Sequence, residues 1–354
     1  MRRNCLRISV EQIVIEKIFI MKKLLIAMMT FLPMWAEAFT GEAVVDGINY
    51  YIVTKAQTAE IRALPHSWDY SDSQRYTGDI VIPESIVYEG IECNVTSIGD
   101  NAFASCTGLV SIEIPNSVIT IGNNAFAYCS GLTAVTIPNS VTGIRAFAFF
   151  NCTGLTSIAI GSGVTSIGEG AFSWCSGLAS VMIPNSVTFI GNQAFQHCSS
   201  LSSVIIGDGV TKIGMEAFLE CKNLTNLTIG SGVTTIYSRA FANCSELTDV
   251  YCLALDVPAT IYSDRYPSPS SDTFQDSYIE YATLHVPASS IEAYRETFPW
   301  KNFKNIVEFV DPSGIQGTIL DKSASTPVYN LSGRRLNEPG KGINIVGGKK
   351  IIVK

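Results

Sequence analysis

Cysteine is the residue type with the widest chemical potential in this chain. Seven cysteines recur at intervals of 23 residues: Cys106, Cys129, Cys152, Cys175, Cys198, Cys221 and Cys244. Thiols form disulfides, bind metal ions or act as nucleophiles, and each use needs its own spacing. No C-x-x-C pair occurs, and a single line of ligands cannot surround a metal ion. An odd file of parallel side chains is a poor disulfide framework, so we expect reduced, buried thiols that pack as small hydrophobic groups.

Other catalytic signals are weak. The three histidines, His66, His197 and His285, are far apart, and no zinc motif, Walker loop or G-x-S-x-G elbow is present. A Gly-x-Gly pair such as Gly161 with Gly163 recurs at one fixed repeat position, which favours a turn over a phosphate site. The sequence therefore predicts a protein that is not an enzyme and has no cofactor or metal.

The cysteines belong to a longer repeat, roughly V-T-x-I-G-x-x-A-F-x-x-C-x-x-L-x-x-V-x-I-P-N-S. Its copies begin, without insertions, at Val95, Val118, Val141, Val164, Val187, Val210 and Val233. Such a fixed period is typical of a solenoid, in which each unit buries its apolar face on its neighbours.

The second copy shows how one coil should fold. Ala125, Phe126 and Cys129 have helical spacing, which predicts one short helical turn. Val135 and Ile137 alternate with outward residues, as in a strand with one buried face. The phenylalanines of the repeat should stack in one row and contribute the largest side chains of the core: Phe103, Phe126, Phe149, Phe172, Phe195, Phe218 and Phe241. We predict a repeat solenoid of seven coils, each with short strands and a helical turn, between two caps.

The motif I-G-x-x-A-F-x-x-C-x-x-L-x-x-I-x-I-P resembles the BspA-like subclass of leucine-rich repeats, a family of surface and secreted proteins of Bacteroidetes. The match runs from Val95 to about Cys252, and two coils replace the motif glycine with Arg145 and Tyr237. The resemblance implies a leucine-rich-repeat-like array. Its functional implication is looser, because some members are associated with adhesion to host matrix proteins.

The N-terminus has the pattern of an export signal. Met21-Lys22-Lys23 supplies positive charge, Leu24 to Trp35 is apolar, and Ala36-Glu37-Ala38 fits a cleavage site. We expect cleavage after Ala38, and we interpret residues 1–20 as an upstream extension. The apolar run is too short for a transmembrane helix, and no later stretch reaches the ~20 residues required. The prediction is an exported protein, extracellular or at the cell surface.

The remaining chain divides by composition and period. Val45–Tyr51 predicts a strand entering a hairpin, Tyr281–Pro287 a strand, and Ser289–Arg295 a capped helix. The predicted divisions are extension and signal peptide 1–38, N-terminal cap 39–94, repeats 95–254, C-terminal cap 255–310, linker 311–326, and a small β module 327–354. This last module resembles C-terminal sorting modules of exported Bacteroidetes proteins, which implies outer-membrane passage or surface association; a plain solvated β tail is the alternative.

Two surfaces could bind a partner. The first, which we call the outer strand row, consists of the outward residues Glu113, Thr136, Ala159, Met182, Ile205, Thr228 and Tyr251. The second is the turn edge, with Tyr128, Phe150 and Trp174. Exposed apolar groups on a rigid platform indicate a contact surface. Packing against the caps or a neighbouring copy is the structural alternative for both.

Charge narrows the choice of partner. The net charge is −7 with 16% charged residues, which gives no electrostatic basis for binding nucleic acid or an anionic membrane. The leading hypothesis is an adhesin-like interaction protein that binds a host or environmental protein or glycoprotein through the solenoid face. A structural spacer of the cell envelope without a specific ligand and an accessory glycan-binding protein are the alternatives.

Overall fold

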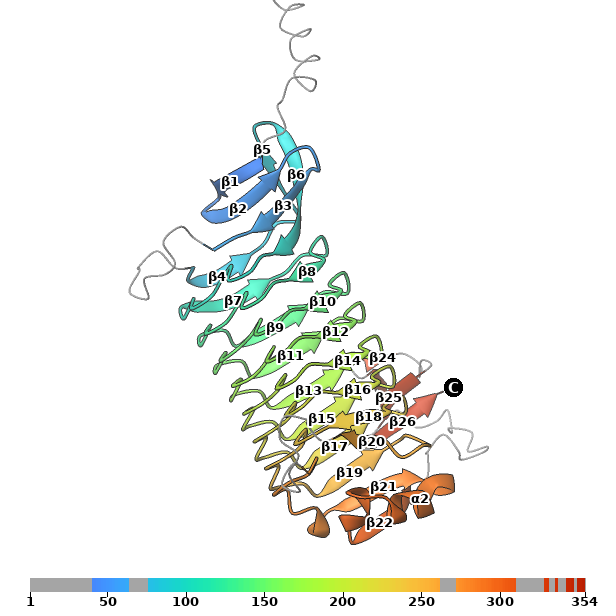
Figure 1. Cartoon of the computed structure of the whole chain (residues 1–354). Helices are drawn as coiled ribbons and strands as arrows, with labels where there is room; N and C mark the ends of the chain where they lie inside the picture. The colour runs from blue at the N-terminus through green and yellow to red at the C-terminus, as the bar shows by residue number, and fades with distance from the viewer. Residues whose placement is uncertain are drawn as a thin grey trace, which may run out of the picture.

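Each 23-residue unit forms one coil of an elongated β-solenoid in the computed structural model (Figure 1). The structure describes residues 40–63, 76–261 and 272–309, together with four short strands between 328 and 353. The predicted signal peptide with its cleavage site and the predicted linker 311–326 lie outside the described residues. The solenoid fold predicted from the repeat is confirmed, and the caps extend the array to about nine coils.

Every coil contributes one strand to each of two faces. Strands of the first sheet are β6 (Ile91–Ile98), β8 (Thr120–Ile121), β10 (Gly143–Ile144), β12 (Ser166–Ile167), β14 (Phe189–Ile190), β16 (Lys212–Ile213), β18 (Thr235–Tyr237) and β20 (Ala259–Ile261). These strands pair in parallel, and each repeat residue lies beside its equivalent in the next coil, as Ile121 does beside Ile144.

The second face carries the longer strands. They are β4 (Gly78–Val81), β7 (Leu109–Glu113), β9 (Ala134–Ile137), β11 (Ser157–Ile160), β13 (Ser180–Ile183), β15 (Ser203–Ile206), β17 (Asn226–Ile229), β19 (Asp249–Cys252), β21 (Thr283–Pro287) and β22 (Asn305–Phe309). They form three parallel ladders, β4-β7, β9-β11 and β13-β15-β17-β19-β21-β22.

The prediction of a short helical turn in each coil is wrong. Asn124 and Tyr128 have positive φ angles of 52° and 63°, which an α-helix does not accommodate. The backbone N–H groups of this segment instead donate alternately to a carbonyl in their own coil and to a carbonyl in the next coil. That of Ala127 donates within its own coil, to Asn124 at 3.0 Å, whereas that of Phe126 donates to the carbonyl of Ala148 in the next coil at 2.7 Å. The repeat spacing of Ala, Phe and Cys therefore reflects successive tight turns that bond across coils.

The core is a stack of identical side chains. The seven phenylalanines of the repeat are fully buried, and neighbouring rings stack with centroids 4.9–5.3 Å apart. Tyr76 and Phe274 from the caps continue this file at its two ends, at 4.9 and 5.6 Å. The seven repeat cysteines are buried beside it as free thiols.

The N-terminal cap closes the first end of the array. Strands β1 (Thr40–Val45), β2 (Ile48–Val53) and β3 (Thr58–Ile61) form antiparallel hairpins. The hairpin expected at this point is present, but Asp46 and Gly47 form its turn, so residues 45–51 are not the single strand that the sequence predicted. Strand β3 then pairs in parallel with β6, while β5 (Ser85–Tyr88) pairs antiparallel with β6. The cap is therefore hydrogen-bonded to the first sheet, which covers the open edge of the array.

The C-terminal cap covers the other end. Strand β21 is followed by helix α2 (Ile291–Glu296), close to the predicted positions of a strand and a helix. The prediction that a side chain caps helix α2 is wrong. The Ser290 hydroxyl donates to the carbonyl of Leu255 at 2.6 Å and forms no hydrogen bond with the start of the helix. Trp300 is fully buried and packs edge-on against Phe274, with ring centroids 5.5 Å apart.

The four C-terminal strands form an antiparallel sheet of their own. They are β23 (Val328–Asn330), β24 (Arg335–Leu336), β25 (Gly342–Val346) and β26 (Lys349–Val353), in the order β24-β23-β25-β26. Strand β25 pairs antiparallel with both β23 and β26, and β24 pairs with the other edge of β23.

Candidate binding surfaces of the solenoid

The outer strand row lies along the second face, one residue from each coil. Parallel pairing places Thr136 beside Ala159, and Met182, Ile205, Thr228 and Tyr251 side by side in that order. Glu113, Thr136 and Ala159 are exposed, whereas the four residues from Met182 onward are partly buried. The row therefore changes character along its length, from polar or small to largely apolar.

The structure extends this row by two residues that sequence reasoning missed. His285 lies beside Tyr251 in the parallel ladder, and Val307 lies beside His285. The rings of Tyr251 and His285 stack with centroids 4.2 Å apart, and His285 Nε2 lies 3.1 Å from an Asp249 carboxylate oxygen. Partial burial and the Asp249 charge raise the pKa of Tyr251. The strand pattern at 281–287 was the available signal, but the 34-residue step from Tyr251 to His285 hides the register.

Small polar residues flank the row. Two positions before it, the strands carry Ser180, Ser203, Asn226 and Asp249, again paired in register. None of these side chains is bulky, so they leave the partly exposed surfaces of Met182, Ile205 and Tyr251 accessible from the side. On the ladder that starts at β13, the second face thus carries an apolar strip beside a polar one.

The turn edge brings aromatic residues together in two clusters. Tyr128, 45% exposed, contacts the partly buried Phe150 edge-on with centroids 5.3 Å apart. Trp174, 46% exposed, stacks on His197 at 4.0 Å, and partial burial lowers the pKa of His197. Tyr128, Trp174 and His197 occupy equivalent positions of their coils, and all three have left-handed φ angles of 57–64°. The stacking of His197 was not expected from the sequence.

Taken together, the fold and these surfaces define a class: a parallel β-solenoid repeat protein with aromatic and apolar residues on its outer surfaces. A family model for the BspA type leucine rich repeat region matches residues 85–200 and 171–295, with 6 copies. The chain belongs to the BspA-type leucine-rich repeat family, as the motif indicated. No curated protein sequence matches it. Within the described residues, no helix is long and apolar enough to cross a membrane.

This chain is also similar to solved structures of bacterial proteins. The leucine rich repeat protein of T. pallidum is 30% identical, with a TM-score of 0.49, over 58% of this chain and 90% of its own. A leucine rich cell surface protein of Faecalibacterium prausnitzii is 20% identical, with a TM-score of 0.34, over 77% and 96% of the two chains. The pneumococcal vaccine antigen PcpA is 13% identical, with a TM-score of 0.36, over 76% and 99%.

Proposed function

We propose that this protein is an exported, surface-displayed interaction protein that binds a protein or glycoprotein partner through its second face. A leucine-rich repeat solenoid is typically a non-enzymatic interaction scaffold. The observation that carries the proposal is the continuous strip formed by Met182, Ile205, Thr228, Tyr251 and His285.

The strip has the features of a contact surface. Apolar groups at the centre with polar groups at the margin resemble the core and rim of a protein interface. The strands beneath are held by parallel hydrogen bonds and by the phenylalanine stack, so little conformational entropy is lost when a partner binds. Tyr251 adds a rigid aromatic ring, a residue type that often anchors interfaces.

The row contains its own matched control for a binding experiment. Thr136 and Thr228 occupy equivalent positions in different coils, but only Thr228 lies between apolar residues of the strip. We expect Thr228→Glu to weaken binding at least about tenfold, because it places a charge at the centre of the contact. Thr136→Glu should leave binding unchanged within about twofold.

Purified protein from residue 39 onward would be measured against a panel of mucin and extracellular-matrix glycoproteins by biolayer interferometry. Circular dichroism and thermal unfolding of both variants establish that the fold is kept. Equal binding by the two variants contradicts the use of the strip. Absence of binding across the whole panel favours the alternative of an envelope spacer.

Surface display is part of the same proposal. The family and the export signal support it, as does the strongly basic C-terminal module, where six Lys or Arg residues accompany one Glu. Protease treatment of intact cells should remove the protein if it is displayed. Full protection, with release only after the outer membrane is permeabilised, would place it in the periplasm and contradict host adhesion.

A further inference from the structure

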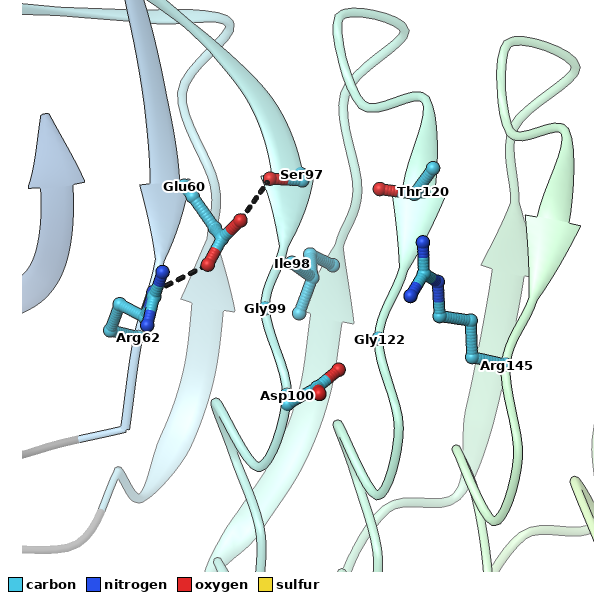
Figure 2. A pocket seen from close by; sticks show the side chains of 9 residues that line it. All are labelled: Glu60, Arg62, Ser97, Ile98, Gly99, Asp100, Thr120, Gly122 and Arg145. Atoms are coloured by element: carbon cyan, nitrogen blue, oxygen red, sulfur yellow. Dashed lines mark hydrogen bonds and ion pairs between the residues drawn. The ribbon is translucent and has the colours of Figure 1, made fainter. Parts of the chain in front are cut away.

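A polar cleft of about 280 Å³ lies on the first sheet, where the N-terminal cap meets the first coils (Figure 2). Its polar lining consists of Glu60, Arg62, Ser97, Asp100, Thr120 and Arg145. These residues belong to β3, β6, β8 and the turns that follow the first-sheet strands, so the cleft shares no residue with the outer strand row. Its volume is near the lower end of the ~300–1,000 Å³ typical of small-molecule sites.

Glycines form the floor of the cleft and let two carboxylates approach it. A Cβ atom on Gly99 would stand 2.7 Å from the Glu60 Oε1 atom, and one on Gly122 would stand 2.6 Å from the Asp100 Oδ1 atom. A Cβ atom would also meet backbone of the preceding rung, the Ile61 carbonyl oxygen at 2.7 Å for Gly99 and the Gly99 carbonyl carbon at 2.6 Å for Gly122. Close backbone stacking therefore requires the motif glycine, and its missing side chain also lets the carboxylates of Glu60 and Asp100 lie at the cleft floor.

The third coil replaces that glycine with Arg145. Five of the seven coils have Gly at this position: Gly99, Gly122, Gly168, Gly191 and Gly214. The Arg145 side chain reaches across Gly122 towards Thr120, and no interaction joins it to the other residues drawn in Figure 2. It forms none of the ion pairs of the described residues. Arg62, by contrast, pairs with Glu60 and lies 4.8 Å above the ring of Tyr51.

The two acids keep acceptor capacity. Glu60 accepts from the Ser97 hydroxyl at 3.2 Å and pairs with Arg62. Asp100 accepts from the backbone N–H of Asn123 at 2.7 Å and from its Nδ2 atom at 3.1 Å. A carboxylate has about four acceptor positions, so each acid can take further hydrogen bonds from donors in the cleft.

We propose that this cleft binds a sugar residue that carries one carboxylate, a uronic or sialic acid unit of an acidic glycan. The carboxylate pairs with Arg145, because a guanidinium matches its planar geometry with two parallel hydrogen bonds. The sugar hydroxyls donate to Glu60 and Asp100. A phosphate ester, with nearly two charges, is repelled by these acids, and a neutral sugar leaves Arg145 without a partner.

The chain offers a substitution that should not disturb the fold. Arg145→Gly restores the residue that most coils have at this position, and Tyr237→Gly makes the corresponding change in a coil outside the cleft. We expect Arg145→Gly to weaken binding at least about tenfold, as loss of a hydrogen-bonded charge pair does. Arg145→Lys should retain part of the affinity, and Tyr237→Gly should retain all of it.

Ligand-observed NMR with matched probes tests the proposal on the chain from residue 39 onward. Sialyllactose is compared with lactose, and trigalacturonic acid with its methyl ester. Saturation transfer to one acidic probe but not to its neutral counterpart supports the site and distinguishes sialic from uronic acid. No transfer to either acid, equal transfer to the neutral probes, or unchanged binding by Arg145→Gly overturns it. Because Thr228→Glu lies on the other face, it should leave these signals intact whether or not the glycoprotein proposal holds.

Discussion

The thiol of Cys152 donates a hydrogen bond to the carbonyl oxygen of Phe126 in the preceding coil, with 3.0 Å between Sγ and O. The same bond recurs from Cys129 to Phe103, Cys175 to Phe149, Cys198 to Phe172, Cys221 to Phe195 and Cys244 to Phe218, at 3.0–3.3 Å. The Phe126 oxygen also accepts from the backbone N–H of Cys129 at 3.2 Å. The thiol thus supplies a second donor to a carbonyl that water cannot reach, which alanine or valine could not do.

Burial should make these thiols unreactive in the folded protein. In the chain from residue 39 onward, we expect no reaction with Ellman's reagent at pH 8, and reaction of all nine cysteines after unfolding in guanidinium chloride. A Thr165→Cys variant, which places a thiol at an exposed position directly before strand β12, should react at once. Rapid labelling of the native repeat cysteines, or disulfides detected by mass spectrometry, would contradict the buried file.

Alkaline pH should destabilise the fold through the same groups. Burial raises the pKa of Cys198 and of Cys244 to about 12 from an ordinary value of 9.0, and that of Cys252 to about 11. The unfolded chain therefore releases protons first, and stability that is complete below pH 9 is lost as the pH rises towards 12. Each such thiol lowers the free energy of unfolding by about 1.4 kcal/mol per pH unit in this window.

Urea unfolding at pH 8, 9, 10 and 11 measures this slope. Tyr50, whose pKa burial raises to about 12, adds to the loss above pH 10. A Cys198→Ser variant has one titrating group fewer and should show a shallower decline than the parent. A flat unfolding midpoint between pH 9 and 11 is incompatible with buried, protonated thiols.

The phenylalanine file should be the most sensitive part of the core. Phe172 is fully buried between Phe149 and Phe195, with ring centroids 5.2 and 5.1 Å away. Phe172→Ala should lower the free energy of unfolding by about 3–5 kcal/mol, through lost transfer energy and a cavity. Phe189 is 38% exposed on the first sheet, so Phe189→Ala should change stability by less than about 0.5 kcal/mol.

Hydrogen exchange would show where this loss is felt. Because each coil contacts only its neighbours, the amides that lose protection in Phe172→Ala should lie in the coil of Val164 and the coils on either side. Uniform loss of protection along the whole array would indicate that the solenoid unfolds as one unit.

The repeat explains why so much of the fold was predictable from one sequence. Inward residues such as Val135 and Ile137 alternate with outward ones in every coil, so the period, the strands of the second face and the files of Phe172 and Cys152 follow from periodicity alone. The turn around Tyr128 could not be predicted in this way. Its hydrogen bonds run to the next coil, and local residue spacing cannot distinguish such a turn from a helical one.

The surfaces were less predictable than the core. His285 joins the outer strand row although 34 residues, rather than the 23 of the repeat, separate it from Tyr251, because β21 keeps the parallel pairing with β19. The cleft at Arg145 depends on Glu60, 85 positions earlier in the chain, and on a register shift between Ala59 and Glu60 in the pairing of β3 with β6. Contacts between residues so far apart in the chain produce no local sequence pattern from which they could be predicted.

Export provides the last test, on residues outside the described structure. If Met21 to Ala38 is a signal peptide, the mature protein begins at Phe39, one residue before strand β1. N-terminal sequencing of the exported protein should read Phe-Thr-Gly-Glu, and its mass should match a start at Phe39. An Ala38→Arg variant removes the small residue that signal peptidase requires and should accumulate uncleaved. A mature protein that retains residues before Met21, or equal processing of the variant, would show that this segment is not a cleaved signal.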